Sequence, residues 1–207
     1  MKKRNILQAI IVVIGIISIA LNFMLFKDAR GLFYYTILSN IYVVGFYLTT
    51  IILDANDKLV KNNRYYILKG LMLLCIVSTM LVYFAAVDAK DNIYAGHMLE
   101  CYSVHLVIPM LAVIECLFFE NKGVLKYRYI PMWALTSFVY LAVLIFYHEV
   151  LNGTFLEGKT YPYDIMNFEK IGWTKGLINC ASILLAFNVL GLIIVFIDNR
   201  MKKAGGK

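Results

Sequence analysis

Long apolar runs alternate with short polar segments along almost the whole chain. Six of these runs reach the roughly 20 residues that an α-helix needs to cross about 30 Å of hydrocarbon. They extend over about 6–26, 32–53, 66–87, 98–119, 129–147 and 174–197. The pattern predicts an all-α fold in which residues 1–207 form one domain, an integral membrane bundle of six transmembrane helices.

The first run raises the question of a signal peptide, because it follows the basic residues Lys2, Lys3 and Arg4. A secretory signal begins in the same way, but its apolar core is shorter and ends at a cleavage site of small residues. Here the apolar run is about 20 residues long, which is enough to span the membrane. We therefore predict that this run is kept as the first transmembrane helix.

The composition supports a membrane protein. Of the 207 residues, 61% are hydrophobic and only 16% are charged, whereas a soluble domain has roughly 25% charged residues. The net charge is +7, but the basic residues flank the apolar runs and do not form a patch that would bind nucleic acid. We expect their partners to be anionic lipid headgroups, and we expect no nucleic acid partner.

The positions of the basic residues predict the orientation in the membrane. Lysine and arginine are concentrated at the N-terminus, in 58–69, in 122–128 and in the C-terminal tail. The positive-inside rule then places both termini in the cytoplasm. We expect a multi-pass protein of the plasma membrane, and the sequence leaves its oligomeric state open.

The longest connection, at about 148–173, is expected on the outer side. A free loop would not need apolar side chains, so those present predict that the loop folds back over the helix ends. They are Ile165, Met166, Phe168, Ile171 and Trp173.

The second run carries an unusual polar face near its start. Thr36, Ser39 and Asn40 lie at positions i, i+3 and i+4, so they share one side of a helix. Polar groups are costly in hydrocarbon and usually face a protein interior, a partner or a cavity. We therefore expect this face to be part of a site or of a helix contact.

His105 in the fourth run lies at a similar depth to Thr36. By the predicted spans, each residue lies within roughly 6–10 Å of the outer boundary at 1.5 Å per residue. A hydroxyl beside an imidazole is a nucleophile with its general base, and this depth suits the ester bond of a lipid. The structural alternatives are a threonine that bonds its own helix and a neutral histidine that bonds a neighbour.

Two further residues of the fourth run could change its structure. Pro109 removes a backbone donor four residues after His105, and it can kink the helix there. Glu115 is expected to pair with a basic group or to reach the inner interface.

A metal site is a second possibility for the same region. His97, Cys101 and His105 lie at i, i+4 and i+8 along one helix face. Histidine and cysteine at this spacing can bind zinc or another soft transition metal. The alternative function is therefore a non-enzymatic membrane protein that binds a metal or a small ligand, or a small transporter subunit.

Three motifs carry a resemblance to a known family: YTILSN at 35–40, SVHLVIP at 103–109 and YPYD at 161–164. Their order, their spacing and the hydropathy of nearly the whole chain resemble the bacterial six-transmembrane branch related to androgen-induced protein and to androgen-dependent tissue factor pathway inhibitor regulating protein (ADTRP). The animal members are threonine-dependent transmembrane hydrolases of fatty acid esters of hydroxy fatty acids.

The resemblance implies a catalytic pair, because the essential threonine of the second span falls on Thr36 and the essential histidine of the fourth span on His105. We therefore expect a hydrolase or acyltransferase that acts on fatty-acyl esters and needs no cofactor. In this hypothesis Thr36 attacks the ester carbonyl and His105 takes its proton. Ser39, Asn40 or Tyr161 would then stabilise the oxyanion.

Overall fold

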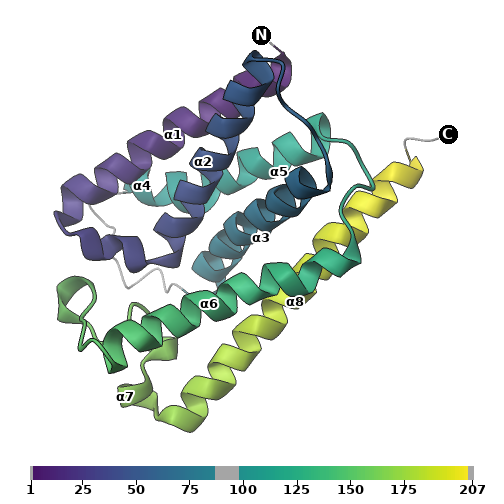
Figure 1. Ribbon diagram of the computed structural model, residues 1–207. Helices are drawn as coiled ribbons and strands as arrows, with labels where there is room; N and C mark the ends of the chain where they lie inside the picture. Colours follow the sequence, from purple (N-terminus) through teal and green to yellow (C-terminus); the bar gives the residue numbers. More distant parts are fainter. Residues whose placement is uncertain (1, 87–97, 205–207) are drawn as a thin grey trace.

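A computed structural model describes residues 2–86 and 98–204 (Figure 1). These residues are mostly helical, and no β-strand occurs among them. Six of their helical stretches are long and apolar enough to cross a membrane. They consist of α1 (Lys3–Phe26), α2 (Tyr35–Ala55), α3 (Asn63–Ala86), the consecutive α4, η2 and α5 (Met98–Tyr102, Ser103–Val107 and Ile108–Phe119), η3 with α6 (Tyr127–Tyr129 and Ile130–Glu149), and α8 (Trp173–Ala204). The protein is therefore an all-α, multi-pass membrane protein, as the six apolar runs predicted.

The largest difference from the predicted helix boundaries is at the end of α8, which continues to Ala204 and does not stop near residue 197. A smaller difference lies at the start of α2. This helix begins at Tyr35 and not near residue 32, because Ala29–Phe33 forms a separate 3-10 turn (η1). Asp28 caps the turn by accepting a hydrogen bond from the backbone N–H of Arg30 at 2.9 Å. The predicted end of the third span, Val87, lies outside the described residues.

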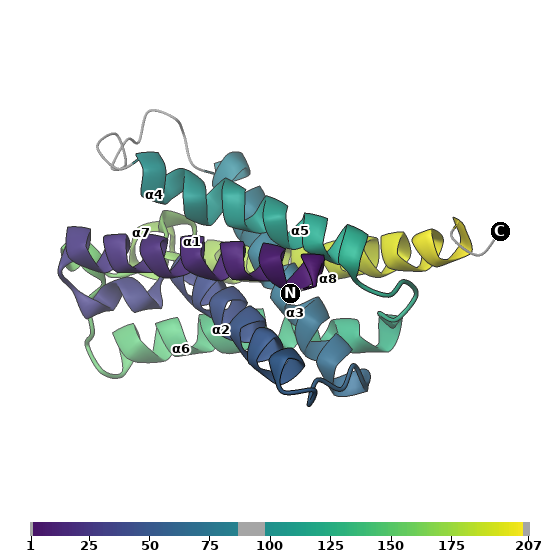
Figure 2. The same cartoon turned by 90° about the horizontal axis from the view of Figure 1, so that it is seen from above.

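α3 is the central helix of the bundle. It packs against α2, α5, α6 and α8, while α1 lies against α2 and α5 (Figures 1 and 2). Two glycines permit close helix contacts, since a Cβ at Gly15 would collide with Val44 and a Cβ at Gly70 with Trp133. The two ends of the described chain lie at the same end of the bundle, as an even number of spans requires (Figure 1).

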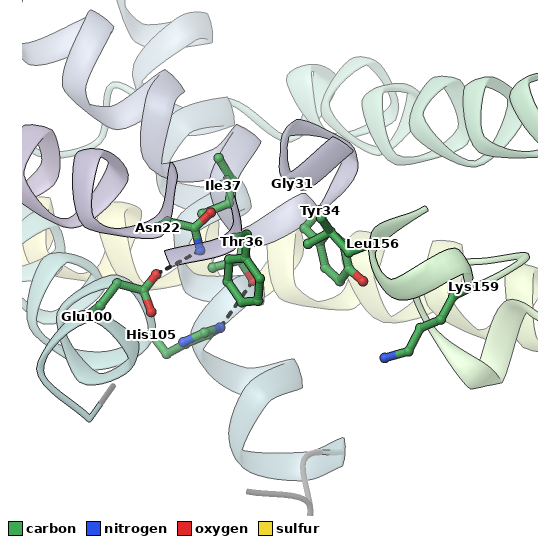
Figure 3. A pocket seen from close by; sticks show the side chains of 10 residues that line it. Asn22, Gly31, Tyr34, Thr36, Ile37, Glu100, His105, Leu156 and Lys159 are labelled. Atoms are coloured by element: carbon green, nitrogen blue, oxygen red, sulfur yellow. Dashed lines mark hydrogen bonds between the residues drawn. The ribbon is translucent and has the colours of Figure 1, made fainter. Parts of the chain in front are cut away.

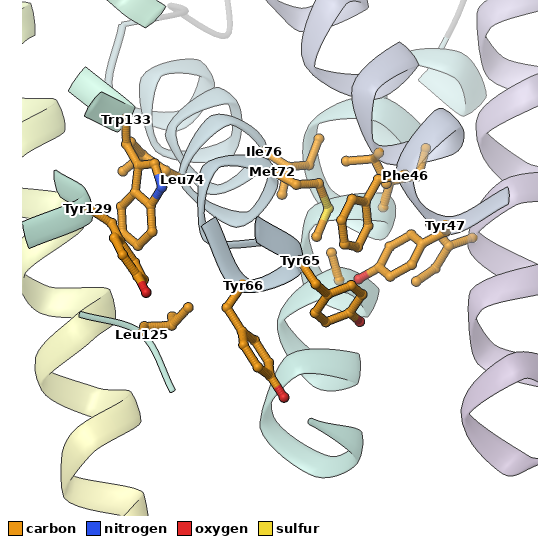
Figure 4. Close-up of a cluster of buried hydrophobic side chains, with 14 of the residues drawn as sticks. Phe46, Tyr47, Tyr65, Tyr66, Met72, Leu74, Ile76, Leu125, Tyr129 and Trp133 are labelled. Carbon is orange, nitrogen blue, oxygen red and sulfur yellow. The ribbon is translucent and has the colours of Figure 1, made fainter. Parts of the chain in front are cut away.

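The buried core surrounds α3 and is rich in aromatic side chains (Figure 4). Trp133 and Tyr47 are completely buried, and the Trp133 Nε1–H donates to the carbonyl of Ile67 at 2.9 Å. Aromatic rings bury large areas, so these contacts fix the helices relative to one another. The core thereby provides a rigid support for side chains near the helix ends.

A charged network is buried in the half of the bundle that contains the N-terminus. Lys69 of α3 pairs with Glu115 of α5, so the expected ion pair of Glu115 is confirmed. Gln8 of α1 and Tyr47 of α2 donate hydrogen bonds to the same carboxylate at 2.5 and 3.2 Å. Four helices therefore meet at one carboxylate.

Glu120 extends this network toward the end of the bundle. It accepts hydrogen bonds from Lys61 and Tyr65, each at 2.7 Å, and lies 3.7 Å from Lys69. Burial raises the pKa of the Glu120 carboxyl, but the nearby Lys69 and the bonds from Lys61 and Tyr65 outweigh this effect. The pKa is consequently below its ordinary value.

The connection from α6 to α8 folds back over the helix ends, as predicted. Met166 and Phe168 are buried in a cluster with Phe155, whereas Ile165 and Trp173 remain exposed. The cluster includes the short helix α7 (Phe168–Ile171), which packs against the start of α8.

Candidate functional site

Thr36 and His105 are brought into hydrogen-bond contact. Thr36 is the second residue of α2, and His105 lies in η2, a π-helical turn between α4 and α5. The distance between Thr36 Oγ1 and His105 Nε2 is 3.2 Å. His105 is 6% exposed and Thr36 is half-buried, so the imidazole is shielded from bulk solvent at a helix contact.

The second ring nitrogen of His105 determines its tautomer. His105 Nδ1 lies 2.9 Å from the backbone carbonyl oxygen of Cys101. A carbonyl can only accept a hydrogen bond, so Nδ1 must carry the proton. In the neutral ring, Nε2 then has a lone pair, and the Thr36 hydroxyl donates to it. This is the arrangement of a nucleophile and its general base.

The π-helical turn accounts for the position of His105. The backbone N–H of Ile108 bonds to Ser103, five residues earlier, which widens the helix by one residue at this point. Pro109 follows and has no N–H, so the carbonyl of Val104 lacks the donor that would continue this pattern. Single π-turns within α-helices are frequent at functional sites.

Asn40 supplies the missing donor from the neighbouring helix. Its Nδ2 group donates to the Val104 carbonyl at 3.2 Å and to the Thr36 carbonyl at 2.8 Å. Asn40 is completely buried. It therefore connects the segment that holds Thr36 to the segment that holds His105.

Ser39 supports the same region. Its hydroxyl donates to the Thr36 carbonyl at 2.9 Å and lies 2.8 Å from the Thr79 hydroxyl of α3. The side chains of Ser39 and Asn40 are thus used in helix contacts, and neither of them lines the pocket next to Thr36.

Tyr83 and Cys101 form the other side of the histidine environment. The Tyr83 ring stacks on His105, with 4.0 Å between the ring centroids. Cys101 donates its Sγ–H to the Tyr83 hydroxyl at 3.1 Å. These contacts hold the imidazole in a fixed orientation.

A pocket of about 70 Å³ lies beside the Thr36–His105 pair (Figure 3). A volume of this size can hold several water molecules. The pocket is lined by residues from α1, η1, α2, α4, η2 and the α6–α8 connection. They are Asn22, Phe26, Gly31, Tyr34, Thr36, Ile37, Glu100, His105, Leu156 and Lys159.

The two charged residues of the pocket lie on opposite sides of the catalytic candidates in Figure 3. Glu100 is buried and accepts a hydrogen bond from Asn22 Nδ2 at 3.1 Å. Lys159 comes from the connection that folds over the helix ends. Sequence patterns did not select Asn22 or Lys159, because their approach to Thr36 depends on the packing of distant segments.

The motif at 161–164 reaches the site through Tyr163. The Tyr163 hydroxyl accepts a hydrogen bond from the backbone N–H of Tyr35 at 3.0 Å. Burial raises the pKa of the Tyr163 phenol, while hydrogen bonds from Tyr35 and Thr36 act in the opposite direction. Tyr161, the residue selected from the sequence, donates to Glu149 at 2.8 Å and does not line the pocket.

The metal alternative depends on His97, which lies outside the described residues. Within 2–86 and 98–204, no three His, Cys, Asp or Glu side chains are grouped as a metal site requires. Cys101 Sγ lies 3.7 Å from His105 Nδ1. Both ring nitrogens of His105 also have the hydrogen-bond partners described above.

Comparison with known proteins gives no match to this chain among protein-family models, curated proteins or solved structures. The site is therefore interpreted from its own geometry.

Proposed function

We propose that this protein is a membrane-embedded hydrolase of fatty-acyl esters, with Thr36 as nucleophile and His105 as general base. The observation that carries the proposal is the 3.2 Å contact between Thr36 Oγ1 and the acceptor nitrogen of His105, beside a pocket. The resemblance of the three sequence motifs to the threonine-dependent hydrolase family supports the same pair. The proposed reaction needs no cofactor.

In the first half of the reaction, Thr36 Oγ1 attacks the ester carbonyl while His105 Nε2 takes the hydroxyl proton. The tetrahedral intermediate collapses, the bond to the alcohol oxygen breaks, and His105 returns the proton to the leaving alcohol. In the second half, a water molecule gives a proton to His105 and attacks the acyl-threonine. The fatty acid leaves and Thr36 regains its proton. An acceptor alcohol in place of water would give acyl transfer.

The N-terminus of α2 is the candidate stabiliser of the oxyanion. Thr36 lies in its first turn, where the positive end of the helix dipole favours negative charge. The Tyr163 hydroxyl does not line the pocket, but it accepts a hydrogen bond from the backbone N–H of Tyr35 at 3.0 Å and so holds the start of this helix. In this proposal the N-terminus of α2 takes the role that the sequence suggested for Tyr161, Ser39 or Asn40.

The substrate class follows from the location of the site. The pocket lies near the end of a membrane-spanning bundle, where ester bonds of lipids occur, and Lys159 provides a positive charge for an anionic group. The positive-inside rule places this end on the outer side of the plasma membrane, with both chain termini in the cytoplasm.

The test is labelling with a fluorophosphonate probe and turnover of a fatty-acyl ester by purified protein. Thr36→Ala and His105→Ala are expected to lose both activities. Thr50→Ala is the matched control, because the Thr50 hydroxyl only bonds the Phe46 carbonyl of its own helix. His148→Ala serves as the histidine control, since His148 bonds Gly153 and Glu169 and does not line the pocket.

Unchanged labelling and turnover in both site variants would exclude this mechanism. Metal analysis of the same preparations separates the alternative function. A bound metal that is lost in Cys101→Ala, together with an absence of ester turnover in the wild type, would favour a metal-binding protein.

A further inference from the structure

Gly45 in the middle of α2 has no packing partner that explains it. A Cβ built at this position meets nothing within 4 Å, whereas at Gly15, Gly70 and Gly191 it would meet Val44, Trp133 and Ile130. Glycine within a helix is about 0.5–1 kcal/mol less favourable than alanine. The space beside Gly45 is therefore retained at a cost to helix stability, although no described part of the chain fills it.

This space belongs to a groove between α2 and α3. The groove has a volume of about 670 Å³, and most of its lining is apolar. It follows α2 from Ile41 to Leu53, a distance of roughly 18 Å at 1.5 Å per residue. Lys58 and Asn62 line its other end, in the connection to α3.

We propose that the groove binds one acyl chain of an anionic membrane lipid, with the lipid headgroup next to Lys58. The length of the groove matches one leaflet, which is about 15 Å or half of the hydrocarbon core. Its apolar length with a basic end matches an amphiphile with a negative headgroup. Basic pockets between transmembrane helices commonly bind anionic headgroups. This site is separate from Thr36 and His105, and it does not depend on the proposed hydrolase.

The length of the groove favours a lipid over a helix from a second copy of the chain. A partner helix would be about 10–12 Å wide with its side chains and would extend across both leaflets. The groove instead follows α2 only from Ile41 to Leu53, which is about the depth of one leaflet, and it has Lys58 at its end. Within the groove, the Tyr42 hydroxyl donates to the Leu68 carbonyl at 2.9 Å, which ties α2 to α3.

The first test fills the groove with Gly45→Leu. Because a Cβ there meets no protein atom, this variant is expected to fold at least as stably as the wild type. Native mass spectrometry after exchange into phosphatidylglycerol should show bound lipid on the wild type and its loss from Gly45→Leu. Ala181→Leu is the matched control, because it adds the same bulk to an exposed position of α8. If Gly45→Leu does not accumulate, Thr49→Phe fills the same groove.

The second test removes the charge with Lys58→Ala. One lysine near an anionic surface contributes about 1 kcal/mol, so the preference for phosphatidylglycerol over phosphatidylcholine should fall about fivefold. Lys175→Ala, at an exposed lysine of α8, should keep the wild-type preference. Equal lipid retention by wild type and Gly45→Leu would overturn the proposal. Unchanged lipid retention together with loss of a dimer in Gly45→Leu would also overturn it. That result would assign the groove to a second copy of the chain.

Discussion

Two buried polar clusters lie in different halves of this bundle. They differ in whether the central polar group borders a pocket described above. Around Glu115, the carboxylate is bound by Lys69, Gln8 and Tyr47, and these four side chains line neither the pocket at Thr36 nor the groove at Gly45. Around Thr36, the hydroxyl contacts an acceptor nitrogen and also borders a pocket that can hold water.

The difference shows why a buried polar residue in a membrane helix is not sufficient to identify a site. The Glu115 carboxylate is paired with Lys69 of another helix, so its charge is neutralised inside the protein. The Thr36 cluster pairs a weak acid with a base and leaves one side open to a small molecule. We therefore propose a structural role for the Glu115 cluster and a chemical role for the Thr36 cluster. The predictions below test that division.

The largest effect is expected for Thr36→Ala. Removing the nucleophile should lower kcat for a fatty-acyl ester by about 10⁴-fold or more, equivalent to about 5.5 kcal/mol of transition-state stabilisation. His105→Gln should cost about 10²–10⁴-fold, as expected for a general base. The melting temperature of both variants should stay close to that of the wild type. A loss of folding in Thr36→Ala would contradict the division between the two clusters.

Lys69→Met should show the opposite behaviour. It leaves the fully buried Glu115 without its cation, and breaking a buried ion pair typically costs about 3–5 kcal/mol of folding stability. The melting temperature in detergent measures this loss. The double variant Lys69→Met/Glu115→Gln should recover part of it, because the unpaired charge is also removed. Ester turnover per folded molecule should remain near the wild-type value in both variants.

Asn40→Ala should have an intermediate effect on turnover. It removes the bonds to the carbonyls of Thr36 and Val104, so the nucleophile and base lose a shared support. A misplacement of about 1 Å can cost roughly 10²-fold in rate. The expected result is a lower kcat with little change in KM, measured with a short-chain ester. A change in KM alone would assign Asn40 to substrate binding instead.

The sequence predicted the six helices because hydrophobic length is a local property of the chain. It also predicted that Thr36 and His105 share a depth, since depth depends only on position within each span. It did not predict the tautomer of His105, which depends on the contact of Nδ1 with the Cys101 carbonyl. Nor did it predict the position of the ring, which depends on a π-turn at 103–107. The contributions of Asn22, Lys159 and Tyr163 were missed for a similar reason, because each requires long-range packing.

The smallest effect is a pH dependence of stability at Glu120, which extends the network around Glu115. Lys69, Lys61 and Tyr65 hold its folded pKa below the ordinary value despite burial, whereas an unfolded glutamate titrates near 4.3. A lowered folded pKa adds stability that is fully present above the unfolded pKa and is lost as the pH falls through the folded pKa. The difference in free energy of unfolding between wild type and Glu120→Gln should therefore be largest near pH 7 and should shrink below about pH 4. Melting curves of both proteins between pH 7 and pH 3 measure this difference in stability. A constant difference over this range would mean that the Glu120 charge does not stabilise the cluster. Thr36→Ala is the control, because its difference in free energy of unfolding from the wild type should not depend on pH.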